Sequence, residues 1–214
     1  MMVTSPRADQ SLRVAIFVSG GGTNLQTLID AAKMGDLGSA KLIKVIASRP
    51  GIKAIERAQL AELPVEIIRK NDFADQNAYD QALIHSLKAC DIDLIVLAGF
   101  LTRLGSRFIA AYKDRIINIH PSLLPEFGGS GFYGLKPHEA VLQAGREVTG
   151  ATVHLVDETY DTGRILLQKK VKVMPEDTPE TLQKRVMREA EQELLPEAVR
   201  QIAAGKLLPE ITRV

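Results

Sequence analysis

The sequence predicts an α/β protein with a mostly parallel, twisted sheet, helices on both faces and an antiparallel pair of strands towards the C-terminus. Three observations support this prediction. Short apolar runs alternate with segments of helical spacing through the first half of the chain. The most apolar run, Asp93–Ala98, has the continuous hydrophobicity of a strand buried on both faces. Two more strand-like segments follow residue 150, joined by a short polar turn.

The alternating elements can be assigned in order. We expect strands at Arg13–Val18, Lys41–Ala47, Pro64–Ile68, Asp93–Ala98 and Ile116–Ile119, and helices at Leu25–Met34, Ile52–Leu63, Asn77–Cys90 and Thr102–Tyr112. Apolar residues recur three or four positions apart in the helices, and Gly35 is a typical stop for the first one. Ligands of such open sheets bind beyond the carboxyl ends of the strands, so the segments after each strand are the candidate site.

The regular alternation of strands and helices ends in the C-terminal half. Strands are expected at Gly150–Val156 and Arg164–Val173, a loop at Pro121–Lys136, and a long helix at Pro179–Ala204 with a break or kink at Pro196. The strand pair is joined by a seven-residue turn and should lie at one side of the sheet.

Composition limits the function classes. A chain of 214 residues with 45% hydrophobic and 25% charged residues is typical of one globular domain, which we expect at 12–214 after a disordered tail at 1–11. Since 27 basic residues face 26 acidic ones, no nucleic-acid partner is expected. No apolar run is long enough for a membrane span, and the tail lacks the apolar core of a secretory signal. The single cysteine, Cys90, suits a reducing compartment, so we expect a cytoplasmic protein.

A glycine-rich turn, Ser19–Asn24, follows the first strand and precedes the first helix. Glycines allow close approach of a ligand, and the N–H groups of a helix N-terminus attract anions, so phosphate is the expected occupant. Leu25 stands where a dinucleotide fingerprint needs its third glycine, and no Gly-Lys-Ser/Thr follows for a Walker A loop. A tight turn without ligand is the alternative. Thr23 or Asn24 is the expected N-cap.

Asn118 and His120 lie at the end of a predicted strand and alternate onto the same face. An amide and an imidazole there could polarise a carbonyl group and move a proton. A carboxylate such as Asp161 could orient the imidazole and favour its charged form, although Asp-Thr-Gly is also ordinary turn chemistry. His138 lies at a helix start, and His154, on a strand, is expected to be structural. No metal-binding spacing of histidines or cysteines occurs.

Together these segments resemble the folate-dependent formyltransferases. The resemblance rests on Asn118-x-His120-Pro-Ser-Leu-Leu-Pro125, Thr149-Gly-x-Thr152-Val-His154 and Asp161-x-Gly163-x-Ile165-x-x-Gln168. Two further motifs, Ser19–Gln26 and Leu97-Ala-Gly-Phe100, narrow it to the phosphoribosylglycinamide formyltransferases of purine biosynthesis. It spans residues 13–206 and implies a Rossmann-like formyltransferase fold.

The resemblance implies transfer of the formyl group of 10-formyltetrahydrofolate, a co-substrate, to the amine of glycinamide ribonucleotide, with no metal. Asn118 and protonated His120 would stabilise the oxyanion, and Asp161 would keep His120 charged and relay a proton. The phosphate would bind the N–H groups of Gly22, Thr23 and Asn24, and Glu191 would bind the ribose hydroxyls. The folate would contact Gln76, Leu101, Thr102, Arg103, Leu104, Asn118, Val156 and Asp157.

Other implications concern partners and departures from the family pattern. The partners would be these two small molecules, with a homodimer allowed. Thr102 and Gln76 stand where many bacterial members carry arginines near the folate tail. The loop Glu126–Pro137 is longer than usual and predicts a mobile lid of altered shape.

Three alternatives are open. Formyltetrahydrofolate deformylases normally carry an additional N-terminal regulatory domain, and methionyl-tRNA formyltransferases an additional C-terminal RNA-binding domain, so the length disfavours both. A non-catalytic nucleotide-binding module would be expected to lose Asn118, His120 or Asp161, and all three are present.

Overall fold

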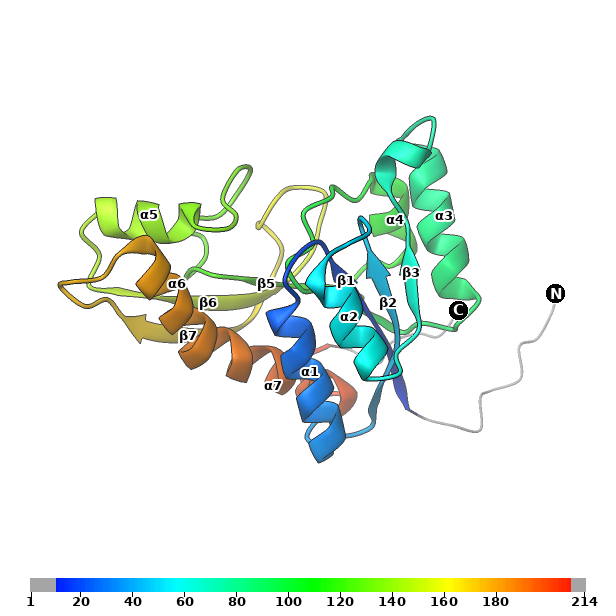
Figure 1. Cartoon of the computed structure of the whole chain (residues 1–214), viewed down its shortest axis with the longest axis horizontal. Helices are drawn as coiled ribbons and strands as arrows, with labels where there is room; N and C mark the ends of the chain where they lie inside the picture. Colours follow the sequence, from blue (N-terminus) through cyan, green and yellow to red (C-terminus); the bar gives the residue numbers. More distant parts are fainter. Residues whose placement is uncertain (1–10, 209–214) are drawn as a thin grey trace.

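The structure, a computed structural model, describes residues 11–208, so the tail expected at 1–11 lies outside the described residues except for Ser11. Seven strands form one sheet in the order β3-β2-β1-β4-β5-β6-β7 (Figure 1). They are β1 (Leu12–Val18), β2 (Ala40–Ala47), β3 (Val65–Ile67), β4 (Leu94–Leu97), β5 (Ile116–His120), β6 (Val148–Leu155) and β7 (Ile165–Lys172). Strands β1 to β5 are parallel, whereas β6 runs antiparallel to β5 and β7 antiparallel to β6. The predicted fold class is confirmed.

Seven α-helices and two short irregular helices accompany the sheet in the described chain. They are α1 (Thr23–Met34), α2 (Lys53–Leu60), η1 (Lys70–Asp72), α3 (Gln76–Lys88), α4 (Ser106–Ala111), α5 (Lys136–Gln143), α6 (Pro179–Val186), the π-turn η2 (Met187–Glu191) and α7 (Gln192–Ala203). No described helix is both long and apolar enough to cross a membrane.

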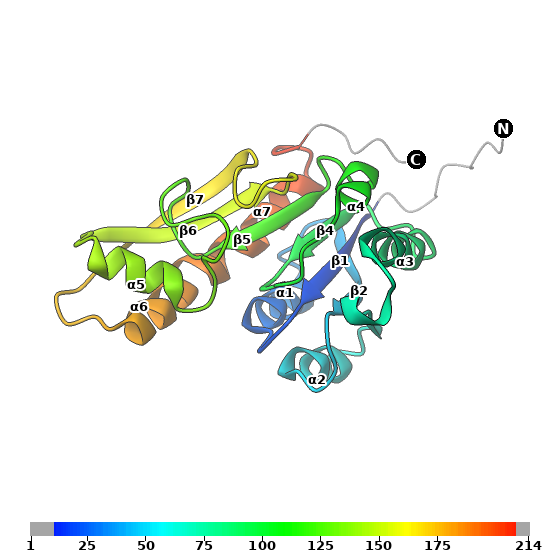
Figure 2. The same ribbon diagram turned by 90° about the horizontal axis from the view of Figure 1, so that it is seen from above.

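The alternation of side chains along the strands divides the core in two. Ile16 packs in a cluster with apolar residues of α1, α2 and α7, and its neighbour Phe17 packs in a second cluster with α3 and α4. Helices α1 and α7 lie side by side on the first face (Figure 2). Both faces of the central strands are therefore covered, which explains their continuous hydrophobicity.

Three elements differ from the sequence-based expectations. Helix α4 begins only at Ser106, so Leu101–Leu104 is loop, and α5 takes up the last residue of the expected 121–136 loop. The long C-terminal helix is interrupted by the π-turn at Met187–Glu191 and not at Pro196, which lies inside α7. Proline crowds the carbonyl group four residues earlier, here that of Gln192, and the irregular turn ends immediately before that residue.

The strand order reverses between β1 and β4. After β1 the chain adds β2 and β3 on one side of β1, and after β4 it adds β5, β6 and β7 towards the opposite edge of the sheet. The loops that follow these two strands are joined, because Ser19 N–H donates to the carbonyl of Gly99 at 3.1 Å and Leu101 N–H donates to Oγ of Ser19 at 2.9 Å. This switch point is where a doubly wound sheet opens a crevice for ligands.

Candidate functional site

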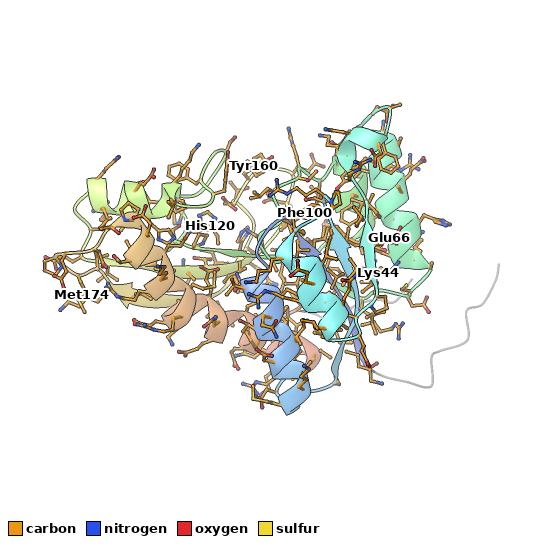
Figure 3. All side chains as sticks on the ribbon, viewed as in Figure 1. Lys44, Glu66, Phe100, His120, Tyr160 and Met174 are labelled. Carbon is orange, nitrogen blue, oxygen red and sulfur yellow. The ribbon has the colours of Figure 1, made fainter. Side chains whose placement is uncertain are left out.

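A cavity of about 430 Å³ opens beyond the carboxyl ends of β4 and β5. It is lined by the first turn of α1, the loop after β4 with α4, the end of β5 with the loop that follows and the first turn of α5, the end of β6 with the loop between β6 and β7, and the region of α6 and the π-turn. Figure 3 shows His120, Phe100 and Tyr160 in this central region, whereas Lys44 and Glu66 lie together at the β3 side and Met174 at the other end of the molecule.

His120 and Asp161 meet in this cavity. Nδ1 of His120 lies 3.5 Å from Oδ2 of Asp161, and their side chains are 4% and 12% exposed. The contact arises because β5 ends at His120 while the turn after β6 carries Asp161, at φ 58, towards it. The expected proximity of the two residues is found.

The protonation of His120 depends on opposing effects. Burial lowers its pKa below the usual value, the charge of Asp161 and a backbone carbonyl raise it, and His154 lowers it further. The net direction is downward, so Asp161 favours the charged ring as expected but burial outweighs it. The pKa of Asp161 lies below its usual value because hydrogen bonds and the two histidines outweigh its burial, which alone would raise it.

One ring nitrogen of His120 is already occupied. Nε2 lies 2.9 Å from the carbonyl oxygen of Phe127, which can only accept, so Nε2 carries a hydrogen. Nδ1 is therefore the nitrogen that faces Asp161 and remains available for a reacting molecule.

His154, which we expect to be structural, contacts the same cluster. Its Nδ1 donates to the carbonyl of Leu155 at 2.7 Å, and its Nε2 lies 3.1 Å from Nδ2 of Asn118 and 3.4 Å from Oδ1 of Asp161. In the neutral ring Nε2 accepts from the Asn118 amide, which fixes how that amide is turned. Register explains the contact, since Asn118 pairs with His154 between β5 and β6.

The glycine loop begins α1 as predicted, but with a different cap. The N-cap is Gly22 at φ 72, not Thr23 or Asn24, and within the described chain no side chain caps this helix end. A Cβ at Gly22 would lie 2.7 Å from Cβ of Ala54 in α2, so only glycine fits. Asn24 lines the cavity, and the first N–H groups of α1 are left for an anion.

Glu191 enters the cavity from the π-turn. It is 4% exposed, and its Oε2 accepts a 2.7 Å hydrogen bond from Nδ2 of Asn24. Burial raises the pKa of Glu191 to about 7, against the lowering effect of Asn24. Oδ1 of Asn24 is buried without a hydrogen-bond partner in the described part of the chain. The pair thus offers both accepting and donating polar groups to a bound molecule.

Most of the residues expected at the folate line the cavity. These are Leu101, Thr102, Arg103, Leu104, Asn118, Val156 and Asp157. The guanidinium of Arg103 lies 5.9 Å from the ring centre of Tyr160, which is 47% exposed. The carboxylate of Asp157 is bonded within its own turn, to Thr159 N–H and the Thr162 hydroxyl, and so shapes the loop.

Gln76 is the one residue expected at the folate that lies outside the lining of the cavity. It does not line the cavity, because its amide donates to Asp80 at 2.7 Å and to the carbonyl of Arg103 at 3.4 Å. Its place at the first turn of α3 puts it behind the Leu101–Leu104 loop, which it supports.

His138, for which the sequence predicts only a place at a helix start, also lies at the cavity. It sits in the first turn of α5, is fully buried and lines the cavity. Burial, together with the charge of His120, lowers its pKa to about 4. In the described structure neither ring nitrogen has a hydrogen-bond partner. The signal available in the sequence was its helix-start position after a glycine-rich loop.

Among the described residues, no group of three or more His, Cys, Asp or Glu side chains could hold a metal ion. The polar side chains of the cavity include amide, imidazole and carboxylate groups, which are suited to acid–base chemistry.

Known proteins resemble this chain over most of its length. The profile of the formyl transferase family matches residues 12–199. The chain is 42% identical over 175 residues to the trifunctional purine biosynthetic protein adenosine-3 of Drosophila melanogaster, which covers 81% of this chain but only 13% of that protein. It is 38% identical over 173 residues to the phosphoribosylglycinamide formyltransferase of Haemophilus influenzae, covering 81% of this chain and 79% of the relative. The crystal structure of glycinamide ribonucleotide transformylase 1 from Symbiobacterium toebii matches with a TM-score of 0.87 at 36% identity, over 95% of this chain and 92% of that one.

Proposed function

The chain belongs to the formyl transferase family, and on that premise we propose that it transfers the formyl group of 10-formyltetrahydrofolate to the amine of glycinamide ribonucleotide. The single observation that carries the proposal is the cluster of buried His120 with partly buried Asn118 and Asp161, beside a cavity that also reaches the N-terminus of α1. The relatives named above as phosphoribosylglycinamide formyltransferases support the choice of acceptor. The catalytic domain would span 12–214.

Asn118 and His120 would act on the formyl oxygen. Attack of the amine on the formyl carbon forms a tetrahedral intermediate, whose oxyanion takes hydrogen bonds from the Asn118 amide and from Nδ1 of His120. Burial lowers the pKa of His120 and the charge of Asp161 raises it, so Asp161 would support the protonated ring that donates from Nδ1.

Asp161 would move the proton. The attacking amine must lose a proton, and the departing folate nitrogen must gain one. The Asp161 carboxylate lies against Nδ1 of His120, so the proton released by the amine can be held by this pair and then given to the folate nitrogen.

The two ends of the cavity would hold the two substrates. The first N–H groups of α1, at Gly22, Thr23 and Asn24, suit the phosphate, and Glu191 suits the ribose hydroxyls. The reduced folate would lie between the Leu101–Leu104 loop and the loop between β6 and β7, with Arg103 facing its acidic tail. No metal takes part in this scheme.

The proposal extends to location and assembly. A cytoplasmic protein is supported by the single cysteine, and the balanced charge gives no reason for a nucleic-acid or membrane partner. A homodimer stays a prediction.

The test is a coupled measurement of folate absorbance and formate release. With both substrates, folate should be released at the rate of nucleotide formylation, and omission of glycinamide ribonucleotide should stop the reaction. Formate release with water as acceptor, and none with the nucleotide, would instead identify a deformylase. Binding of both ligands without turnover of either would identify a non-catalytic module.

A further inference from the structure

The loop between β5 and α5 contacts both His120 and Asp161 through its backbone. The carbonyl of Phe127 accepts from Nε2–H of His120 at 2.9 Å, and Gly129 N–H donates to Oδ2 of Asp161 at 2.8 Å. Gly128 is the one residue between them. In Figure 1 this loop lies beside the loop that carries Asp161, between β6 and β7. A three-residue peptide segment thus reaches both members of the pair.

We propose that the Phe127–Gly129 backbone is a positioning clamp that holds His120 and Asp161 together as an ion pair. The polarity of each contact fits that role. A carbonyl oxygen stabilises an imidazolium, and an N–H group stabilises a carboxylate, so both bonds favour the charged forms against the effect of burial. The effect of the clamp on catalysis rests on the proposed function, whereas its effect on the charges of His120 and Asp161 does not.

Phe127 adopts an unfavourable backbone conformation to make its contact, whereas glycine at position 129 adopts a positive φ without strain. Phe127 has φ 54 and Gly129 has φ 98. A bulky residue in the left-handed region is strained, and such strain persists only where the surroundings enforce it.

The surroundings here are a chain of hydrogen bonds that leads back to the sheet. The Ser122 hydroxyl donates to the carbonyl of Glu126 at 2.7 Å, and the Thr152 hydroxyl donates to the carbonyl of Ser122 at 2.7 Å. Thr152 belongs to β6, so the entry to the clamp is held by a rigid element.

A glycine is required at position 128 because there is no space for a side chain, and not because of its backbone conformation. A Cβ at this position would lie 2.3 Å from Cδ2 of Leu124, a buried side chain, and 3.2 Å from Cβ of Asp161. An added methyl group must therefore displace the Leu124 side chain or the Gly128 backbone, and it also presses on Asp161. Gly145, at φ 61 after α5, has nothing within 4 Å of its would-be Cβ and does not line the cavity, so it provides the control.

The experiment is an NMR titration of the His120 ring in the unmodified protein, G128A and G145A, without substrate. The titratable groups that face His120 are Asp161, His154 and His138, so the ring itself must be observed and not the pH profile alone. In G128A the pKa of His120 should fall by about 0.5–1 unit, because the charged form loses support. In G145A it should not change.

Kinetics with the two proposed substrates give the second readout. In G128A we expect kcat to fall about 10- to 100-fold with both KM values within about twofold, since a small misplacement of reacting groups affects the transition state most. A folded G128A with unchanged His120 titration would overturn the clamp. If the titration shifts but the unmodified protein forms no formylated nucleotide, the clamp stands and the proposed function fails.

A second variant tests the clamp if G128A does not fold. S122A removes the hydroxyl that donates to the carbonyl of Glu126 at the entry to the clamp, so the clamp predicts that the pKa of His120 falls, as in G128A. A folded S122A with an unchanged His120 titration would overturn the clamp.

Discussion

The side-chain amide of Asn24 donates a 2.7 Å hydrogen bond to Oε2 of Glu191, 167 residues further along the chain, and both side chains are buried. The bond joins the N-terminus of α1 to the end of the π-turn. It keeps Glu191 inside the cavity in an environment that raises its pKa to about 7.

The first prediction concerns stability and pH. The pKa of Glu191 is raised from 4.5 to about 7 on folding, so the folded protein favours the protonated form and loses stability as pH rises through that interval. E191Q retains the acceptor for Asn24 without the charge. It should be more stable than the unmodified protein near pH 8, by up to about 3 kcal/mol, and the difference should vanish near pH 4.5. Thermal unfolding at both pH values checks this, and a difference independent of pH would contradict it.

The second prediction concerns the reacting groups. H120A and D161A should each lower kcat by about 10²–10⁴-fold, because each removes a proton-transfer or oxyanion-stabilising group. Binding of the phosphate substrate should change little, since the expected phosphate contacts are at α1. Turnover and calorimetric binding of glycinamide ribonucleotide check the two parts. Rates near those of the unmodified protein would refute the catalytic assignment.

The third prediction concerns His154, whose Nε2 orients the Asn118 amide. H154L should lower kcat about tenfold by freeing that amide to turn. In an N118A background the same change should have almost no further effect, because the group it orients is gone. A double-mutant cycle measures this coupling, and additive losses would show that the two side chains act independently.

The fourth prediction concerns the glycine loop. G22A introduces a Cβ 2.7 Å from Ala54 at a left-handed φ of 72, so it should shift the first turn of α1. We expect KM for the nucleotide to rise about tenfold or more, with kcat less affected. G51A serves as the control, with a comparable φ of 69 and nothing within 4 Å of the added carbon. Equal effects of the two variants on KM would show that strain alone is responsible.

Sequence periodicity could predict which strands carry the site but not which strands pair. Alternation placed Asn118 and His120 on one face at the end of β5, where the structure has them. It could not reveal that His154 lies opposite Asn118, because that contact depends on the register between β5 and β6.

Loop geometry was the other feature that could not be predicted from the sequence. The contacts from Phe127 and Gly129 come from backbone atoms, which leave no residue-type pattern in a sequence. The support role of Gln76 likewise depends on how the first turn of α3 packs behind Arg103, a relation between segments 27 residues apart. In contrast, the glycine-rich loop after β1 could be recognised in the sequence, and at Gly22 the lack of a Cβ is itself the structural requirement.

Ser39 joins the start of β1 to the end of α7. It accepts from Leu12 N–H through its carbonyl at 3.1 Å and donates through its hydroxyl to the carbonyl of Ala203 at 3.3 Å. The contact lies roughly 20 Å of strand from the carboxyl end of β1. A substitution that weakens it is therefore expected to lower the stability of the fold and to leave the acid–base groups of the cavity in place.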